Sequence, residues 1–220
     1  MKNQYVVIGL GRFGSSLAQT LMEQEQEVLV IDKDIDIINH AASYATQAVQ
    51  MDATDEQALE AAGIGNFDTA CVCTGDVQSS IMITLLCKEL GAQNVLAKAG
   101  SDLHEKMLLK MGADRVVFPE RDSGVRQAMN LVSSNILDFI QVSDDFGIAE
   151  FETGREWAGK SLAEMRFRQN YGVNVVAVKP KAGKININPK AQDILTEHDV
   201  IVVLGREEAL QKLEKIAEKR

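Results

Sequence analysis

The residues best suited to chemistry stand near the start of the chain, where three glycines follow an apolar run. Val6-Val7-Ile8 leads into Gly9-Leu10-Gly11-Arg12-Phe13-Gly14, a G-x-G-x-x-G pattern between a predicted strand and a predicted helix. In such a pattern the first glycine allows a tight turn, the second lets a phosphate approach the backbone, and the third lets the helix pack closely on the sheet. The N–H groups and the dipole of the helix N-terminus attract an anion. We therefore expect a nucleotide phosphate at Gly9, Gly11, Phe13 and Gly14.

Two charged side chains extend this site. Asp32 ends the second apolar run, where an acid accepts hydrogen bonds from ribose hydroxyls and disfavours a 2′-phosphate. Arg12 lies inside the glycine loop, and its planar guanidinium suits the oxygens of a terminal phosphate. These residues predict an adenine nucleotide or dinucleotide as the ligand. The alternatives are a glycine-rich turn kept only for packing and an Arg12 whose stem only packs at the surface.

Two short polar loops follow the third and fourth predicted strands. In a parallel sheet these loops open on the same edge as the glycine loop, so they are candidates for adenine and ribose contacts. The alternative is that Asp55 and Asp76 only start the helices that follow. The candidate contacts are Lys33, Asp52, Ala53, Thr54, Thr74 and Gly75.

The chain lacks the residue patterns of common enzymes. His40, His104 and His198 do not stand beside an acid in an obvious relay, and no tyrosine is followed by a lysine four residues later. A P-loop lysine motif and a nucleophile elbow are also missing. The sequence therefore favours a non-catalytic binding protein. The alternative is an NAD-dependent oxidoreductase or an NADH-sensing regulator.

The order of apolar runs predicts the fold of the first 120 residues. Continuous apolar strands alternating with helices indicate a parallel sheet covered on both faces. The expected fold class is α/β, with a Rossmann-type doubly wound parallel sheet. The expected strands are Tyr5–Ile8, Val28–Ile31, Ala48–Met51, Thr69–Cys73, Val95–Ala97 and Arg115–Phe118. The expected helices are Ser15–Met22, Ile35–Ala42, Glu56–Ala62, Ile81–Leu90 and Leu103–Met111.

The second part of the chain has a different pattern. An apolar stripe predicts one long helix over Ser123–Ile140, which is either a linker or an interface helix. A small α+β module follows, so we expect domains at residues 1–120 and 142–220 joined by residues 121–141. The expected strands of the module are Ile148–Phe151, Val173–Val178, Lys184–Ile187 and Val200–Leu204, and its expected helices are Ser161–Phe167 and Glu207–Lys219.

Charge and hydropathy exclude several classes of protein. The net charge is −9, and residues 1–120 hold 8 basic and 17 acidic side chains against 15 of each in residues 121–220. An acidic chain repels the phosphates of nucleic acids, so we expect no nucleic-acid partner. No apolar run approaches the roughly 18–20 residues of a membrane span, and the N-terminus lacks the order of a signal peptide. We therefore expect a cytoplasmic protein.

Three cysteines, Cys71, Cys73 and Cys87, argue against a disulfide framework because their number is odd and no secretion signal precedes them. Cys71 and Cys73 share one face of a predicted strand. We expect all three thiols to be buried as small apolar groups, with redox or metal use as the alternative.

Three segments together resemble one protein family. They are Gly9–Gly14, Gly112–Glu120 and Arg168–Val178. In this order they resemble the RCK (regulator of potassium conductance) cytoplasmic subunits of bacterial Ktr/Trk-type potassium uptake systems, most closely the KtrA/KtrC-like proteins. The resemblance covers nearly the whole chain. It implies a nucleotide-binding Rossmann domain followed by a small C-terminal RCK domain.

The resemblance also implies a non-enzymatic role. Subunits of this family form homodimers that assemble into a ring, usually an octamer, beneath a membrane-embedded potassium-transporting subunit. A member is therefore expected at the inner face of the cell membrane, attached through its partner. ATP favours the active ring and ADP the inactive one, and some members bind NAD or NADH.

Several site residues match the family by position. Arg12 matches an arginine directed at the terminal phosphate, and Asp32 matches the ribose acid. Lys98 stands where a basic residue faces the nucleotide. Glu120 matches an acid near the phosphates that can help to hold a cation such as Mg²⁺, Ca²⁺ or Na⁺. The segment Ser123–Ile140 matches a helix that crosses over to the partner subunit, which favours the interface interpretation.

The C-terminal domain of several members binds cyclic di-AMP at a dimer interface. The residues here that match that site are Leu162, Ala163, Arg168 and Asn174. The sequence departs from the family at two nearby positions. Arg166 replaces an acid, and Ala163 replaces a larger aliphatic residue.

Overall fold

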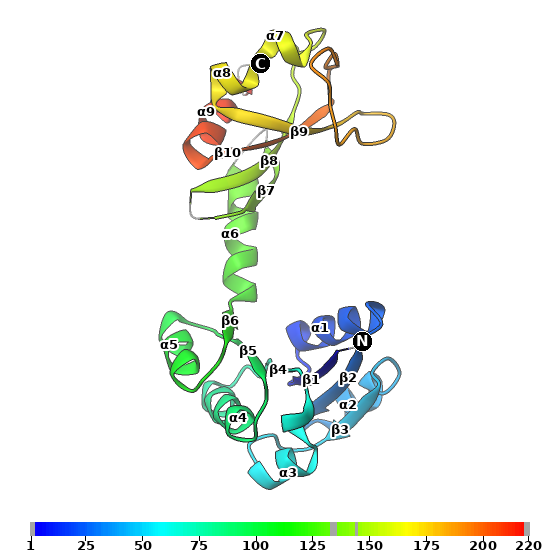
Figure 1. The fold of residues 1–220 in the computed structure, drawn as a ribbon, viewed down its shortest axis with the longest axis vertical. Helices are drawn as coiled ribbons and strands as arrows, with labels where there is room; N and C mark the ends of the chain where they lie inside the picture. The colour runs from blue at the N-terminus through cyan, green and yellow to red at the C-terminus, as the bar shows by residue number, and fades with distance from the viewer. Residues whose placement is uncertain (1–2, 133–135, 144, 218–220) are drawn as a thin grey trace. The chain divides into compact units, whose positions relative to one another are not determined.

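The computed structural model describes residues 3–132, 136–143 and 145–217. The chain divides into two compact units, Met1–Arg121 and Asp122–Arg220. Figure 1 shows the elements of both units.

The N-terminal unit is built on a six-stranded parallel sheet with the strand order β3-β2-β1-β4-β5-β6 (Figure 1). The order reverses between β1 and β4, and in open parallel sheets ligands bind at that reversal, beyond the carboxyl ends of the strands. The expected doubly wound sheet is confirmed, with strand ends that shift by a few residues. The strands are β1 (Gln4–Ile8), β2 (Glu27–Asp32), β3 (Gln47–Gln50), β4 (Thr69–Val72), β5 (Asn94–Lys98) and β6 (Arg115–Val117).

Helices cover both faces of this sheet. Successive residues of a strand point to opposite faces, so Val6 packs in one core cluster and Val7 in another. The cluster around Val6 includes Leu59 of α3 and Leu108 of α5, whereas the cluster around Val7 includes Ala18 of α1. The helices are α1 (Arg12–Glu23), α2 (Ile35–Ala41), α3 (Glu56–Ala61), α4 (Val77–Glu89) and α5 (Asp102–Lys110), with the 3₁₀ helix η1 (Ile64–Asn66) after α3.

The thiols of Cys71, Cys73 and Cys87 are buried in these cores, as expected. Burial raises the pKa of Cys71 to about 12 and that of Cys87 to about 12, and it also raises the pKa of Cys73. The thiolate form is therefore scarce at neutral pH, which does not favour redox chemistry.

The segment after β6 differs from the sequence prediction. Helix α6 (Pro119–Val132) begins four residues before the predicted start, and β7 (Ile136–Gln141) is a strand paired with β8. The predicted single helix over Ser123–Ile140 is therefore wrong over residues 136–140, and its residues 133–135 lie outside the described residues. Strand β7 gains its hydrogen bonds from β8, a strand that lies further along the chain.

The C-terminal unit holds a four-stranded antiparallel sheet with the order β7-β8-β10-β9 (Figure 1). Phe151, Ile201 and Leu213 are fully buried in its core. The small α+β module is confirmed. Its other elements are β8 (Phe146–Glu152), α7 (Leu162–Met165), α8 (Phe167–Tyr171), β9 (Val173–Lys179), β10 (Val200–Arg206) and α9 (Glu207–Ala217).

Two predictions for this unit are wrong in detail. The predicted strand Lys184–Ile187 is reduced to a single bridge between Asn186 and Val178, because Gly183 and the Asn-Pro step at 188–189 favour turns. The predicted helix Ser161–Phe167 is two short helices, since Arg166 between them adopts a left-handed conformation with φ +47°.

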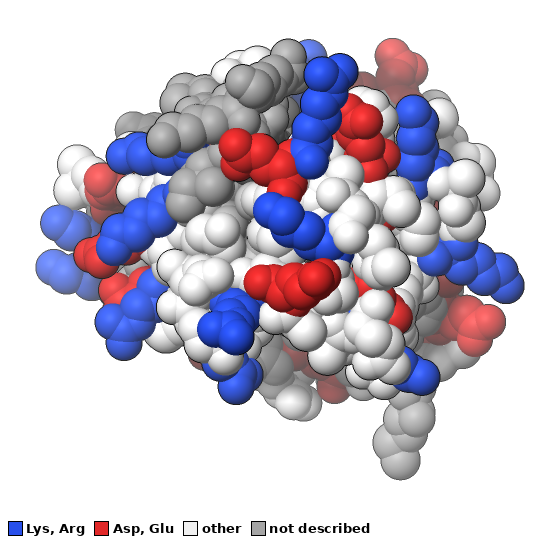
Figure 2. Space-filling view, turned by 90° about the horizontal axis from the view of Figure 1, so that it is seen from above, with Lys and Arg blue, Asp and Glu red and all other residues white. Residues whose placement is uncertain are grey.

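Charge and hydropathy in the structure agree with the composition. On the face drawn in Figure 2, lysine and arginine side chains are interspersed with aspartate and glutamate side chains. Within the described ranges, no helix combines the length and the hydropathy that a bilayer crossing requires.

Candidate functional site

The glycine loop between β1 and α1 has the backbone that its glycines predict. Gly9 has φ +91°, and a Cβ there would lie 2.7 Å from the backbone N of Thr74. A Cβ on Gly14 would lie 2.0 Å from the carbonyl oxygen of Gly9. Only glycine therefore fits at these two positions, and α1 packs directly on the loop.

Gly11 differs from its neighbours, because a Cβ there would meet no atom within 4 Å. Gly11 is the N-cap of the 12-residue helix α1 and offers no side chain to cap its N–H groups. These N–H groups and the helix dipole are thus available to an anion over an open backbone. Arg12 is exposed beside them, and Phe13 is half-buried against the core.

Asp32, the last residue of β2, holds the glycine loop by a hydrogen bond. Its Oδ2 accepts a hydrogen bond of 2.7 Å from the N–H of Leu10, and its Oδ1 accepts one of 3.0 Å from the N–H of Asp34. A carboxylate offers about four acceptor positions, so both oxygens keep room for a ribose hydroxyl. Asp32 thus shapes the loop in addition to the ribose contact predicted for it.

The loops after β3 and β4 meet at the same edge. The hydroxyl and the N–H of Thr54 donate to Asp52 at 2.7 and 2.9 Å and lower the pKa of its carboxyl group. Lys33 lies close enough to lower the pKa of both Asp52 and Asp76 further. The fold therefore brings these predicted residues together at one sheet edge.

Some polar residues of these loops serve the helices instead. Asp55 accepts from the N–H of Gln57 and caps α3, and Asp76 accepts from the N–H of Ser79 and caps α4. Ala53 is buried in the core below its loop.

A cavity of about 230 Å³ opens at the carboxyl ends of β4 and β5. The Nζ of Lys98 lies 2.6 Å from the Oε1 of Glu120, and this hydrogen bond lowers the pKa of Glu120. The cavity adjoins the glycine loop, because the backbone of Thr74 touches Gly9. Its walls are Thr74, Gly75, Lys98, Ala99, Gly100, His104, Phe118, Glu120 and Arg121.

Sequence reasoning missed His104 in this wall. The residue is 3% exposed, and its Nδ1 accepts a hydrogen bond of 3.3 Å from the N–H of Gly100. Burial lowers the pKa of His104. His104 lies in the first turn of α5, and no pattern in the sequence marks a lone histidine in a predicted helix as part of a cavity wall.

Arg121 was also missed. Its guanidinium lies 3.5 Å from the centre of the Phe118 ring, and it pairs with Asp102 at 3.0 Å.

No group of three or more metal-binding side chains occurs in the described part of the chain. The cation at Glu120 therefore remains a prediction.

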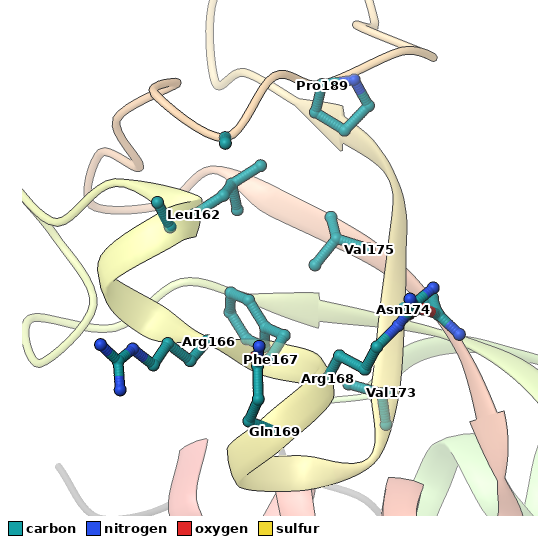
Figure 3. A pocket seen from close by; sticks show the side chains of 11 residues that line it. Leu162, Arg166, Phe167, Arg168, Gln169, Val173, Asn174, Val175 and Pro189 are labelled. Atoms are coloured by element: carbon teal, nitrogen blue, oxygen red, sulfur yellow. Dashed lines mark hydrogen bonds between the residues drawn. The ribbon is translucent and has the colours of Figure 1, made fainter.

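A second cavity, of about 440 Å³, lies in the C-terminal unit (Figure 3). All four residues predicted for a cyclic dinucleotide, Leu162, Ala163, Arg168 and Asn174, line it. Arg168 donates from Nε to the Oδ1 of Asn174 at 2.9 Å, and Figure 3 shows these two side chains side by side. Figure 3 also shows Arg166 pointing the other way from the same helical segment.

Comparison with known proteins identifies the family. Residues 5–119 match the TrkA-N domain and residues 148–218 match the TrkA-C domain. The chain is 40% identical to the Ktr system potassium uptake protein C of Bacillus subtilis (strain 168) over 216 residues, which are 98% of this chain and 97% of that protein. The chain belongs to the Ktr family of potassium uptake proteins.

A second relative has the same relation. The Ktr system potassium uptake protein A of Bacillus subtilis (strain 168) is 40% identical over 212 residues, covering 96% of this chain and 95% of that protein. Membership in the Ktr family confirms the resemblance to KtrA/KtrC-like RCK subunits. It does not favour the oxidoreductase alternative.

Solved structures share the fold. The crystal structure of the GsuK RCK domain matches with a TM-score of 0.70 at 20% identity, covering 100% of this chain and 48% of that chain. The GsuK channel bound to NAD matches with a TM-score of 0.70 at 19% identity, covering 100% of this chain and 40% of that chain. At these identities the match establishes the fold alone.

Proposed function

We propose that this Ktr-family chain is the regulatory subunit of a potassium uptake system and that its N-terminal unit binds ATP and ADP. The observation that carries the proposal is the glycine loop, where an open Gly11 backbone and an uncapped helix N-terminus stand beside the Asp32 carboxylate. NAD or NADH fits the same loop. The chain then acts by binding and switching, without catalysis.

The residues fit such a ligand. The glycine loop and the dipole of α1 attract the phosphates, Arg12 reaches the terminal phosphate, and Asp32 accepts from the ribose. Lys33, the Asp52–Thr54 loop and the Thr74–Gly75 loop stand at the same sheet edge for the remaining contacts. These local groups have to overcome the net negative charge of residues 1–120.

The assembly follows from the family. We propose homodimers that form an octameric ring on the inner face of the membrane, bound to a membrane-embedded potassium-transporting subunit. Residues 1–120 would be the nucleotide domain and residues 142–220 the C-terminal domain. ATP and ADP would shift the ring between two states only as far as their contacts differ. Arg12 is the group that we expect to distinguish them.

Calorimetric titration of the full chain with ATP, ADP and NAD tests this function. We expect ATP and ADP to bind and Arg12→Ala to weaken ATP more than ADP. Absence of binding by all three nucleotides would refute the proposal. An equal effect of Arg12→Ala on ATP and ADP would refute the role of Arg12.

We further propose that the C-terminal cavity binds cyclic di-AMP, because all four family-matched residues line one cavity and Arg168 is held by Asn174. Hydrogen bonds to charged groups contribute about 1.5–3 kcal/mol, so Arg168→Ala should weaken binding at least tenfold. Arg155→Ala is the matched control, because Arg155 is an exposed arginine of the same unit that does not line the cavity. Equal losses in both variants, or no heat with the unmodified chain, would contradict this assignment.

A further inference from the structure

Lys98 and Glu120 are both expected to serve a bound nucleotide, yet they contact each other. The Nζ of Lys98, at the end of β5, lies 2.6 Å from the Oε1 of Glu120, the second residue of α6. A lysine that holds a carboxylate at this distance is not free to receive a phosphate in the same direction. An ammonium group has three N–H donors, so a phosphate takes the donor that Glu120 now occupies only if Glu120 leaves it.

The surroundings of the two side chains indicate which one moves. The side chain of Lys98 is 19% exposed and that of Glu120 is 70% exposed. An ammonium group in a largely buried place needs an anionic partner, whereas an exposed carboxylate that is released regains water. Lys98 therefore keeps an anion in both states, and Glu120 is the partner that can leave.

The cavity gives a phosphate access to Lys98. Thr74 and Gly75 line it on the side of the glycine loop, and the Thr74 backbone touches Gly9. The exchange proposed below requires a nucleotide whose phosphates start at the N-terminus of α1 to bring its last phosphoryl group to the cavity mouth. Phosphate and carboxylate oxygens accept the same charge-assisted hydrogen bond, and phosphate brings more negative charge.

We propose that Glu120 is an internal competitor for the phosphate, which occupies Lys98 until a phosphoryl group of the nucleotide replaces it. This inference rests on the proposed nucleotide function. It makes the first turn of α6 respond to the ligand, because Glu120 leaves Lys98 only when a phosphate arrives. The boundary between the two units falls in this same helix.

The test is the affinity of the full chain for ATP in EDTA, so that no divalent cation contributes. We expect Glu120→Gln to bind ATP about twofold to fivefold more tightly, the effect of removing one exposed ion pair. The gain should vanish when Lys98→Met is also present, and adenosine should bind both forms equally. Glu105→Gln is the matched control, since Glu105 lies on neighbouring α5 and does not line the cavity.

Several results would overturn the exchange. ATP affinity that is unchanged or lower in Glu120→Gln means that Glu120 does not compete. A gain that persists with Lys98→Met, or that Glu105→Gln reproduces, means that only the overall charge matters. An unmodified chain that binds no ATP refutes the proposed function itself, whereas normal ATP binding with any of the other results refutes the exchange alone.

Discussion

Two glycines of the same loop should fail in different ways when each is replaced by alanine. The methyl group of Gly14→Ala would lie 2.0 Å from the Gly9 carbonyl oxygen and 3.1 Å from the Cβ of Cys73. Backbone cannot yield as a flexible side chain does, so either the loop or α1 has to shift. The methyl group of Gly11→Ala would meet no atom of the protein within 4 Å.

The magnitudes follow from these contacts. Overpacking costs about 1–3 kcal/mol, and alanine within a helix returns roughly 0.5–1 kcal/mol, so Gly14→Ala should lose about 1–2 kcal/mol. For a unit of this size that lowers Tm by roughly 3–8 °C. Gly11→Ala should leave Tm within about 2 °C of the unmodified chain. Because its methyl group stands where a phosphate approaches, it should still weaken ATP by at least about tenfold, or roughly 1.4 kcal/mol.

Thermal denaturation without nucleotide and calorimetric titration with ATP separate the two effects. Gly14→Ala should lose both stability and binding, and Gly11→Ala should lose binding alone. An unchanged Tm for Gly14→Ala would refute the packing argument. Full ATP affinity in Gly11→Ala would refute the position assigned to the phosphates.

Three further predictions concern stability and reactivity. Burial lowers the folded-state pKa of His104 below its ordinary 6.5, so the unfolded chain binds more protons and stability is lost as the pH falls below about 6.5. In His104→Leu the unfolding free energy, measured in urea between pH 5 and 8, should therefore depend less on pH. A pH dependence equal to that of the unmodified chain would contradict this. Cys71, with a pKa of about 12, should react with a thiol reagent at pH 8 only after denaturant is added, and rapid labelling of the native chain would show that burial does not protect it. Ser161→Ala removes the acceptor for the N–H of Glu164 in the capping box of α7. It should lower the free energy of unfolding, measured by urea denaturation, by about 1 kcal/mol, and a loss below about 0.3 kcal/mol would argue against the cap.

The sequence predicted the parts of the structure that local rules determine. The glycine loop and the position of Asp32 follow from a motif whose spacing requires a particular turn, and the six parallel strands follow from apolar runs that alternate with helices. The sequence also indicated that Asp55 and Asp76 could start helices, and both do so. These two caps depend on residues that lie within three positions of one another.

The sequence predictions fail where contacts between residues far apart in the chain determine the structure. Ile136–Gln141 is apolar enough for either a helix or a strand, and its pairing with β8 selects the strand. The bond between Lys98 and Glu120 joins residues 22 positions apart. Their family roles did not indicate that they contact each other. His104 was missed because a lone histidine in a predicted helix gives no sign that its ring lines a cavity.

Potassium flux measures whether a nucleotide at the glycine loop controls potassium uptake. The measurement uses the chain reconstituted with its membrane partner in vesicles, with saturating ATP or ADP, and compares the unmodified chain with Gly11→Ala. We expect a higher flux with ATP than with ADP for the unmodified chain, and no difference for Gly11→Ala. Equal flux with both nucleotides for the unmodified chain, or a full ATP response in Gly11→Ala, would contradict the account.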